Sequence, residues 1–155
     1  MFVVFISTTS IAQDTTQQIT PNRYNSADAQ KKPYVILISI DGLRSDFVEK
    51  FKAPALQAYG QSGVVAEYMT SAFPSLTFPN HYSIVTGLYP AHHGLVDNTF
   101  FDEKANATYT MSNKKMVADP YWYGGTPLWV LAEKQQMVTA SFYWVASEAP
   151  IGNTK

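Results

Sequence analysis

The residues most suited to catalysis or ligand binding lie between Phe73 and Ser83, around the hydroxyl group of Thr77. Pro79 is tolerated in the first turn of a helix, and the helical pattern that follows stops at Gly87, a common helix C-terminal residue. Thr77 is therefore expected at a helix N-terminus, where free backbone N–H groups and the helix dipole favour a phosphate or another anion. A simple N-cap role for Thr77 explains the same pattern.

As a nucleophile, Thr77 would need activation, because an alkyl hydroxyl is barely ionised at neutral pH. One candidate base is His81, which lies one helical turn further on and on the same face. The other route is metal coordination. Asp41 offers a hard oxygen ligand for zinc or magnesium, so Asp41 and Thr77 would share one metal if their loops converge. Asp41 could instead be a plain helix N-cap.

Other polar residues offer weaker signals. Asn98 could donate its side-chain amide to a developing phosphoryl oxygen, although a turn-forming asparagine is the simpler interpretation from the residues alone. His92 and His93 are adjacent, so their side chains point apart on any regular element and make a poor chelating pair.

The elements that would position these residues alternate between strands and helices. Residues 34–40 are a continuous apolar run typical of a central strand covered on both faces, and Asp41 follows its C-terminal end, where open α/β sheets bind ligands. This alternation predicts an α/β fold with a mostly parallel sheet. Further expected elements are strands at 64–69 and 138–145, helices at 45–51, 54–59 and 126–134 (with Thr126 as N-cap and Pro127 as first helical residue), and a hairpin within 95–111.

Composition excludes several functional classes. The 155 residues carry a net charge of −1, which argues against a nucleic-acid-binding surface. There is no cysteine, so disulfides and thiolate metal sites are excluded. No apolar run approaches the roughly 20 residues that cross a bilayer, so we expect no transmembrane segment.

The chain divides into three predicted parts. Residues 1–6 are apolar, and the small residues Ser10 and Ala12 fit a cleavage site before Gln13. This pattern predicts a signal peptide at residues 1–12 and a secreted or periplasmic protein, although a basic n-region is missing. Residues 13–33 have the composition of a flexible linker. Residues 34–155 form the folded domain, and the final segment lacks a closing element, which predicts the N-terminal part of a longer domain.

Four ordered segments of this domain resemble the nucleotide pyrophosphatase/phosphodiesterase family of the alkaline phosphatase superfamily. They are residues 38–44, 73–82, 86–90 and 93–98, and the similarity extends to about residue 152. The resemblance implies a doubly wound, mostly parallel sheet with helices on both faces. It also implies a metal-dependent hydrolase whose partner is a small nucleotide phosphodiester or pyrophosphate.

The resemblance implies a site with two zinc ions, in which Asp41 and the Thr77 hydroxyl bind one metal. Thr77 would attack phosphorus and form a phosphothreonine that is then hydrolysed. Asn98 matches the family's donor to a phosphate oxygen, while Phe78 and Trp144 match positions that line the substrate pocket. From the residues alone, both aromatic side chains could equally belong to the core.

Two departures from the family pattern matter. Val145 and Ala146 stand where the family has proline and glycine, so the loop after Trp144 is expected to differ in shape. The family's remaining zinc ligands are expected beyond Lys155, so the 155 residues alone are expected to have little or no activity. Alternative functions are a phosphodiesterase for lysophospholipid, choline-type or other phosphate esters, or a non-catalytic α/β binding module.

Overall fold

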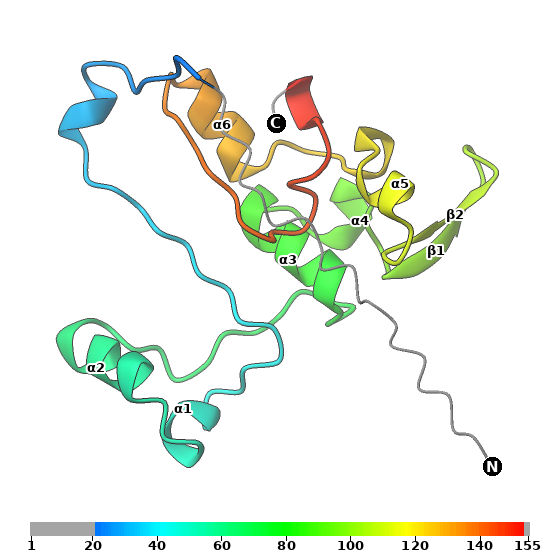
Figure 1. Cartoon of the computed structure of the whole chain (residues 1–155). Helices are drawn as coiled ribbons and strands as arrows, with labels where there is room; N and C mark the ends of the chain where they lie inside the picture. Colours follow the sequence, from blue (N-terminus) through cyan, green and yellow to red (C-terminus); the bar gives the residue numbers. More distant parts are fainter. Residues whose placement is uncertain (1–20, 154–155) are drawn as a thin grey trace, which may run out of the picture.

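The computed structural model describes residues 21–153, which form a mixed α/β fold with one small sheet (Figure 1). Six α-helices are assigned within these residues, together with three 3-10 turns and two strands. The helices are α1 (Phe47–Lys50), α2 (Pro54–Ser62), α3 (Thr77–Thr86), α4 (Pro90–His93), α5 (Lys114–Val117) and α6 (Leu128–Lys134). The turns are η1 (Ala29–Lys31), η2 (Pro120–Trp122) and η3 (Ile151–Asn153), and the strands are β1 (Thr99–Asp102) and β2 (Ala107–Thr110).

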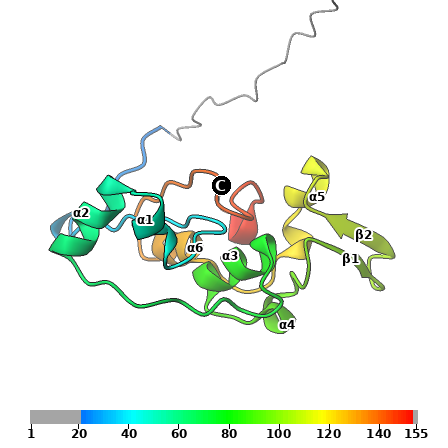
Figure 2. The same ribbon diagram turned by 90° about the horizontal axis from the view of Figure 1, so that it is seen from below.

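Helix α3 lies at the centre of the hydrophobic core. In Figures 1 and 2 it sits between α6 on one side and the β1–β2 hairpin on the other. The buried side chains of Tyr82 and Val85 on α3 pack with apolar residues from the segments around it. These partners are Leu95, Tyr109, Val117, Trp122, Tyr123, Val130, Val145, Ala146, Ala149 and Ile151.

The ends of α3 agree with the sequence prediction. The helix begins at Thr77, and Pro79 lies in its first turn, where no intrahelical hydrogen bond is lost. At the other end Gly87 takes a left-handed conformation with φ of 68°, which glycine adopts without steric cost. The local signals therefore set both boundaries of the helix that carries the candidate nucleophile.

The predicted hairpin is also present. Strands β1 and β2 are antiparallel, with Thr99 opposite Thr110 and Phe100 opposite Tyr109. Tyr109 is fully buried, and the ring centroids of Phe100 and Tyr109 are 5.3 Å apart. The hairpin thus covers one side of the core around α3.

The three predicted strands at residues 34–40, 64–69 and 138–145 are not strands in the described structure. The sheet contains only the antiparallel pair β1–β2, and the doubly wound parallel sheet is not seen in residues 21–153. A strand requires a hydrogen-bonded neighbour, and the long apolar run has none here: Tyr34, Val35 and Ile36 are each more than four-fifths exposed. These sequence predictions were wrong for the described residues because strand formation depends on distant partners.

The predicted helices at 45–51, 54–59 and 126–134 are present with shifted ends, as α1, α2 and α6. Helix α2 continues through Gly60 to Ser62, and α6 begins at Leu128 with Pro127 rather than Thr126 as its N-cap residue. Helices α1 and α2 contribute no buried residue, so they lie outside the core.

The described part of the predicted linker, residues 21–33, contacts the end of α6. Arg23 forms an ion pair with Glu133, and the Ser26 N–H donates to the Gln136 carbonyl oxygen over 3.0 Å. The predicted signal peptide, residues 1–12, lies outside the described residues. None of the helices within residues 21–153 has the length and apolar character needed to cross a membrane.

Candidate active site

The structure brings the candidate nucleophile and the candidate carboxylate together. Thr77 is the first residue of α3, and its Oγ1 donates a hydrogen bond to Oδ2 of Asp41 over 3.1 Å. Asp41 is exposed and Thr77 is half-buried, so both oxygens are accessible from solvent. The two residues are 36 positions apart in sequence and meet because the turn at Asp41 reaches the N-terminus of α3.

This pair of oxygens fits a metal ion as well as a proton. In a tetrahedral zinc site, two ligand oxygens at about 2.0–2.2 Å from the ion are about 3.3–3.6 Å apart. Thr77 Oγ1 and Asp41 Oδ2, 3.1 Å apart, would need to separate by only a few tenths of an ångström to reach this distance. Carboxylate and hydroxyl oxygens are also the hard donors that zinc and magnesium accept. Within residues 21–153 no group of three or more His, Cys, Asp or Glu side chains is arranged to hold a metal.

His81 is not bonded to the Thr77 hydroxyl group. Its Nδ1 lies 2.7 Å from the carbonyl oxygen of Thr77, and its Nε2 lies 2.9 Å from Oγ of Ser39. Both ring nitrogens are therefore engaged, and neither is placed to remove the hydroxyl proton. The position on the same helical face was predicted correctly, but the base role is not supported by this geometry. Asp41 is the group that accepts from the hydroxyl.

Asn98 lies beside the N-terminus of α3. Its Oδ1 accepts a hydrogen bond from the backbone N–H of Phe78 over 3.0 Å, which fixes the orientation of the amide group. Within the described residues no hydrogen bond uses its Nδ2. The amide is thus held by its oxygen while its N–H groups remain available to an acceptor next to Thr77.

Phe78 and Trp144 are both half-buried at the edge of the core. The Phe78 ring lies 6.5 Å from that of Tyr109, and the Trp144 ring meets His81 edge to face at 5.9 Å. Trp144 Nε1 also donates to the His81 carbonyl oxygen over 3.3 Å. Each ring therefore has a packing role on one side and an exposed part on the other.

The two residues that depart from the family pattern follow Trp144 directly. Val145 and Ala146 are buried, and Ala146 adopts a left-handed φ of 72°. This conformation favours glycine, the residue that the resemblance to the family implies at this position. Alanine therefore occupies a left-handed backbone conformation in this loop.

Sequence reasoning did not single out Ser39, which binds His81. The position of Ser39 two residues before Asp41 could have identified it, because residues two apart in an extended segment lie on the same face. The adjacent histidines do diverge: His92 is exposed, whereas His93 is buried and its Nε2 lies 2.9 Å from Ser83 Oγ.

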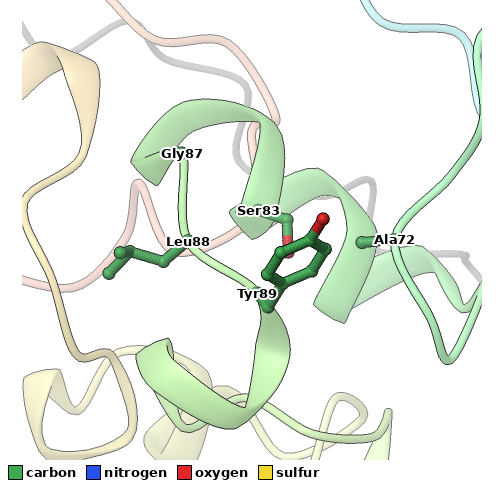
Figure 3. Close-up of a pocket in the computed structure, with 5 residues that line it drawn as sticks. All are labelled: Ala72, Ser83, Gly87, Leu88 and Tyr89. Atoms are coloured by element: carbon green, nitrogen blue, oxygen red, sulfur yellow. The ribbon is translucent and has the colours of Figure 1, made fainter.

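A shallow cavity of about 250 Å³ lies on another face of α3 (Figure 3). Figure 3 shows the Tyr89 ring beside Ser83, with Ala72 next to them. The cavity is lined by Ala72, Ser83, Gly87, Leu88 and Tyr89, none of which is a candidate catalytic residue. The candidate site is therefore the exposed surface at the N-terminus of α3, not this cavity.

Comparison with known proteins finds similarity over the part of the chain that contains the candidate site. Residues 35–155 match the family described as type I phosphodiesterase / nucleotide pyrophosphatase. The chain is similar to human ectonucleotide pyrophosphatase/phosphodiesterase family member 1, with 38% identity over 121 residues, which cover 77% of this chain and 13% of the relative. It is also similar to mouse bis(5'-adenosyl)-triphosphatase enpp4, with 38% identity over 137 residues, or 87% of this chain and 29% of that protein. The chain thus spans less than a third of either relative.

Proposed function

We propose that this chain, which belongs to the type I phosphodiesterase/nucleotide pyrophosphatase family, is part of a hydrolase that cleaves phosphodiester or pyrophosphate bonds of nucleotides. The names of its relatives, a nucleotide pyrophosphatase/phosphodiesterase and a bis(5'-adenosyl)-triphosphatase, support a nucleotide substrate. The observation that carries the proposal is the 3.1 Å hydrogen bond from Thr77 to Asp41 at the N-terminus of α3.

In the proposed reaction Thr77 is the nucleophile. Its Oγ1 forms a bond to phosphorus while the bond from phosphorus to the leaving oxygen breaks, which leaves a phosphothreonine for water to hydrolyse. Asp41 Oδ2 accepts the hydrogen bond of the Thr77 hydroxyl group. Asp41 is therefore positioned to orient the attacking Thr77 oxygen and to accept the hydroxyl proton.

Asp41 and Thr77 are also the residues that we propose to hold one of two zinc ions, with the remaining ligands contributed by residues outside this chain. The proximity of the two oxygens and their hard-donor chemistry support this assignment. When bound, zinc acts as a Lewis acid that lowers the pKa of a coordinated hydroxyl group and stabilises developing negative charge.

Charge on the phosphoryl oxygens would be stabilised by donors at the start of α3. The Nδ2 of Asn98 is oriented by the bond from Phe78 N–H to Oδ1, so it needs no reorganisation as charge develops. The helix N-terminus adds free N–H groups and a positive dipole end. Preorganised donors of this kind are commonly worth a factor of about 10²–10³ in kcat each.

The exposed parts of Phe78 and Trp144 are proposed to contact the nucleobase. Stacking on an aromatic ring accepts different bases, because every base has a π-face. We also propose that the protein acts outside the cytoplasm, secreted or periplasmic, because of the predicted signal peptide at residues 1–12 and the "ecto" designation of a relative.

The test is hydrolysis of a chromogenic nucleotide diester with added zinc. Thr77→Ala is expected to lower kcat by a factor on the order of 10³ or more, whereas Thr77→Ser keeps a hydroxyl and retains part of the rate. Thr70→Ala, outside the site, is the matched control. An unchanged kcat in Thr77→Ala would refute the nucleophile. Faster cleavage of lysophospholipid or monoester substrates than of nucleotide diesters would refute the substrate class.

The same assay tests the proposed metal site. The 155 residues alone are expected to show little or no turnover, because the second zinc ion lacks its ligands. The comparison is therefore also made on the protein that includes the rest of the family domain. Zinc-dependent turnover by the 155 residues alone would overturn the claim that further ligands are required.

A further inference from the structure

We propose that His81 is a positioning residue that holds the Asp41 segment against the nucleophile-bearing end of α3. This inference rests on the proposed function, since it assigns His81 a task in placing Asp41 and Thr77. His81 does not contact the reacting atoms, and its effect is exerted through Ser39 and through the Thr77 carbonyl group.

The first observation is how few bonds hold the Asp41 segment. Within the described residues, two hydrogen bonds join residues 33–43 to α3, and both are between side chains. One is the candidate catalytic pair itself, from Thr77 to Asp41. The other joins Ser39 Oγ to His81 Nε2 over 2.9 Å. Ser39 lies only two residues from Asp41, so this bond restrains the position of the carboxylate.

The second observation is the hydrogen-bonding direction at the His81 ring. The Thr77 carbonyl oxygen can only accept, so Nδ1 of His81 must carry the proton of the 2.7 Å bond. In the neutral ring Nε2 is then unprotonated and accepts from the hydroxyl of Ser39. One neutral imidazole therefore connects the backbone of the nucleophile to the segment that carries its carboxylate partner.

The third observation is that the ring and backbone of His81 are themselves held. Trp144 packs edge to face on the ring with centroids 5.9 Å apart, and its Nε1 donates to the His81 carbonyl oxygen over 3.3 Å. These contacts, together with the α3 backbone, limit the rotamers open to the side chain. A ring fixed in this way can act as a rigid spacer between Thr77 and Ser39.

The tautomer of His81 gives a spectroscopic test that does not need turnover. At about pH 8, long-range ¹⁵N spectra of the histidine rings should show His81 protonated at Nδ1. His93 is the internal control, because its Nδ1 accepts from Leu95 N–H over 3.2 Å, so its neutral ring must carry the proton on Nε2. Ser39→Ala should shift the Nε2 resonance of His81 and the carboxylate ¹³C resonance of Asp41. It should leave the His93 ring unchanged.

The functional arm uses the active protein with the full family domain. Ser39→Ala is expected to lower kcat by about 5- to 10-fold with little change in KM, the loss expected for one hydrogen bond that orients reacting groups. Ser39→Thr retains a hydroxyl group and should restore most of the rate, and Ser71→Ala is the matched control. His81→Asn keeps a donor near the Thr77 carbonyl but cannot reach Ser39. Its combination with Ser39→Ala should therefore cost less than the two losses multiplied.

The outcomes separate this inference from the proposed function. Protonation of His81 at Nε2, or an unchanged Asp41 resonance in Ser39→Ala, would overturn the positioning role whether or not the protein hydrolyses nucleotides. An unchanged kcat in Ser39→Ala, in a protein whose turnover depends on Thr77, would overturn it as well. Absence of nucleotide hydrolysis in the unchanged protein, with the expected spectra, would refute the proposed function while the bridge through His81 stands.

Discussion

At the scale of single residues, His93 shows how burial sets the chemistry of a side chain. It is 1% exposed, packs edge to face on Tyr82 with ring centroids 5.0 Å apart, and is hydrogen-bonded to Ser83 and to the Leu95 N–H. Burial lowers the pKa of the His93 imidazole below its ordinary value of 6.5, although backbone hydrogen bonding opposes part of this effect. The neutral ring is therefore the form that the folded state favours.

This shift predicts that the folded protein is less stable in mild acid. Because the folded pKa of His93 is depressed, the unfolded chain takes up the proton first as the pH falls through 6.5, and stability is lost until the folded pKa is passed. The free energy of unfolding should fall by up to about 1.4 kcal/mol per pH unit as the pH falls below 6.5. Urea unfolding across this range measures the slope.

The control for this prediction is the neighbouring histidine. His93→Gln should remove this part of the slope, whereas His92→Gln, at an exposed position, should retain it. Equal slopes in the unchanged protein and in His93→Gln would show that His93 is not the titrating group.

At the scale of elements, the end of α6 is held by a pair of reverse hydrogen bonds. The Gln136 N–H donates to the Glu133 carbonyl over 2.9 Å, and the Met137 N–H donates to the Ala132 carbonyl over 3.1 Å. This is the Schellman arrangement, in which the residue after the C-cap takes a left-handed conformation. Gln136 has φ of 59°, a conformation that glycine adopts at lower cost.

Gln136→Gly is therefore expected to raise the free energy of unfolding by about 0.5–1 kcal/mol, because it relieves the left-handed strain at an exposed position. Gln135→Gly is the matched control. Gln135 has φ of −96°, so glycine there relieves nothing and should cost about 0.5–1 kcal/mol through added unfolded-state entropy. Thermal unfolding of both variants and of the unchanged protein measures these differences in stability. A Gln136→Gly variant less stable than the unchanged protein would contradict the assignment of this motif.

At the scale of the whole molecule, the apolar run at residues 34–40 lies outside the core and is accessible to other chains. Val35 is 88% exposed and Ile36 is 83% exposed. Within the described residues no backbone N–H of this run donates a hydrogen bond to another backbone group. An extended apolar segment with unpaired backbone groups is a template for pairing with another strand.

We therefore expect the 155-residue chain to self-associate as its concentration rises. Ile36→Lys should weaken this association by about tenfold or more, because a lysine within the pairing segment adds charge repulsion. Tyr59→Lys is the control, since Tyr59 is 75% exposed but lies in α2, whose backbone is bonded internally. Sedimentation velocity over a concentration series is the measurement. Equal association of Ile36→Lys and the unchanged chain would exclude this segment as the contact.

Local sequence signals were sufficient to predict the elements that depend on neighbouring residues. Pro79 and Gly87 set the limits of α3 through their own backbone preferences, and the β1–β2 hairpin followed from turn residues between apolar segments. The position of His81 relative to Thr77 also followed, because residues four apart lie on one helical face. The four ordered motifs were likewise sufficient to identify the family, and the family match over residues 35–155 confirmed this prediction.

The pairing of groups that lie far apart in the sequence became known only from the folded chain. The contact of Asp41 with Thr77 and the bridge from His81 to Ser39 each join residues more than 30 positions apart. The absence of strands at 34–40 within the described residues has the same origin. Helices and tight turns satisfy their backbone groups within a few residues, whereas strands and sites require partners from distant parts of the chain. Local preferences in a sequence therefore specify helices and tight turns, whereas strands and sites are specified only by the folded chain.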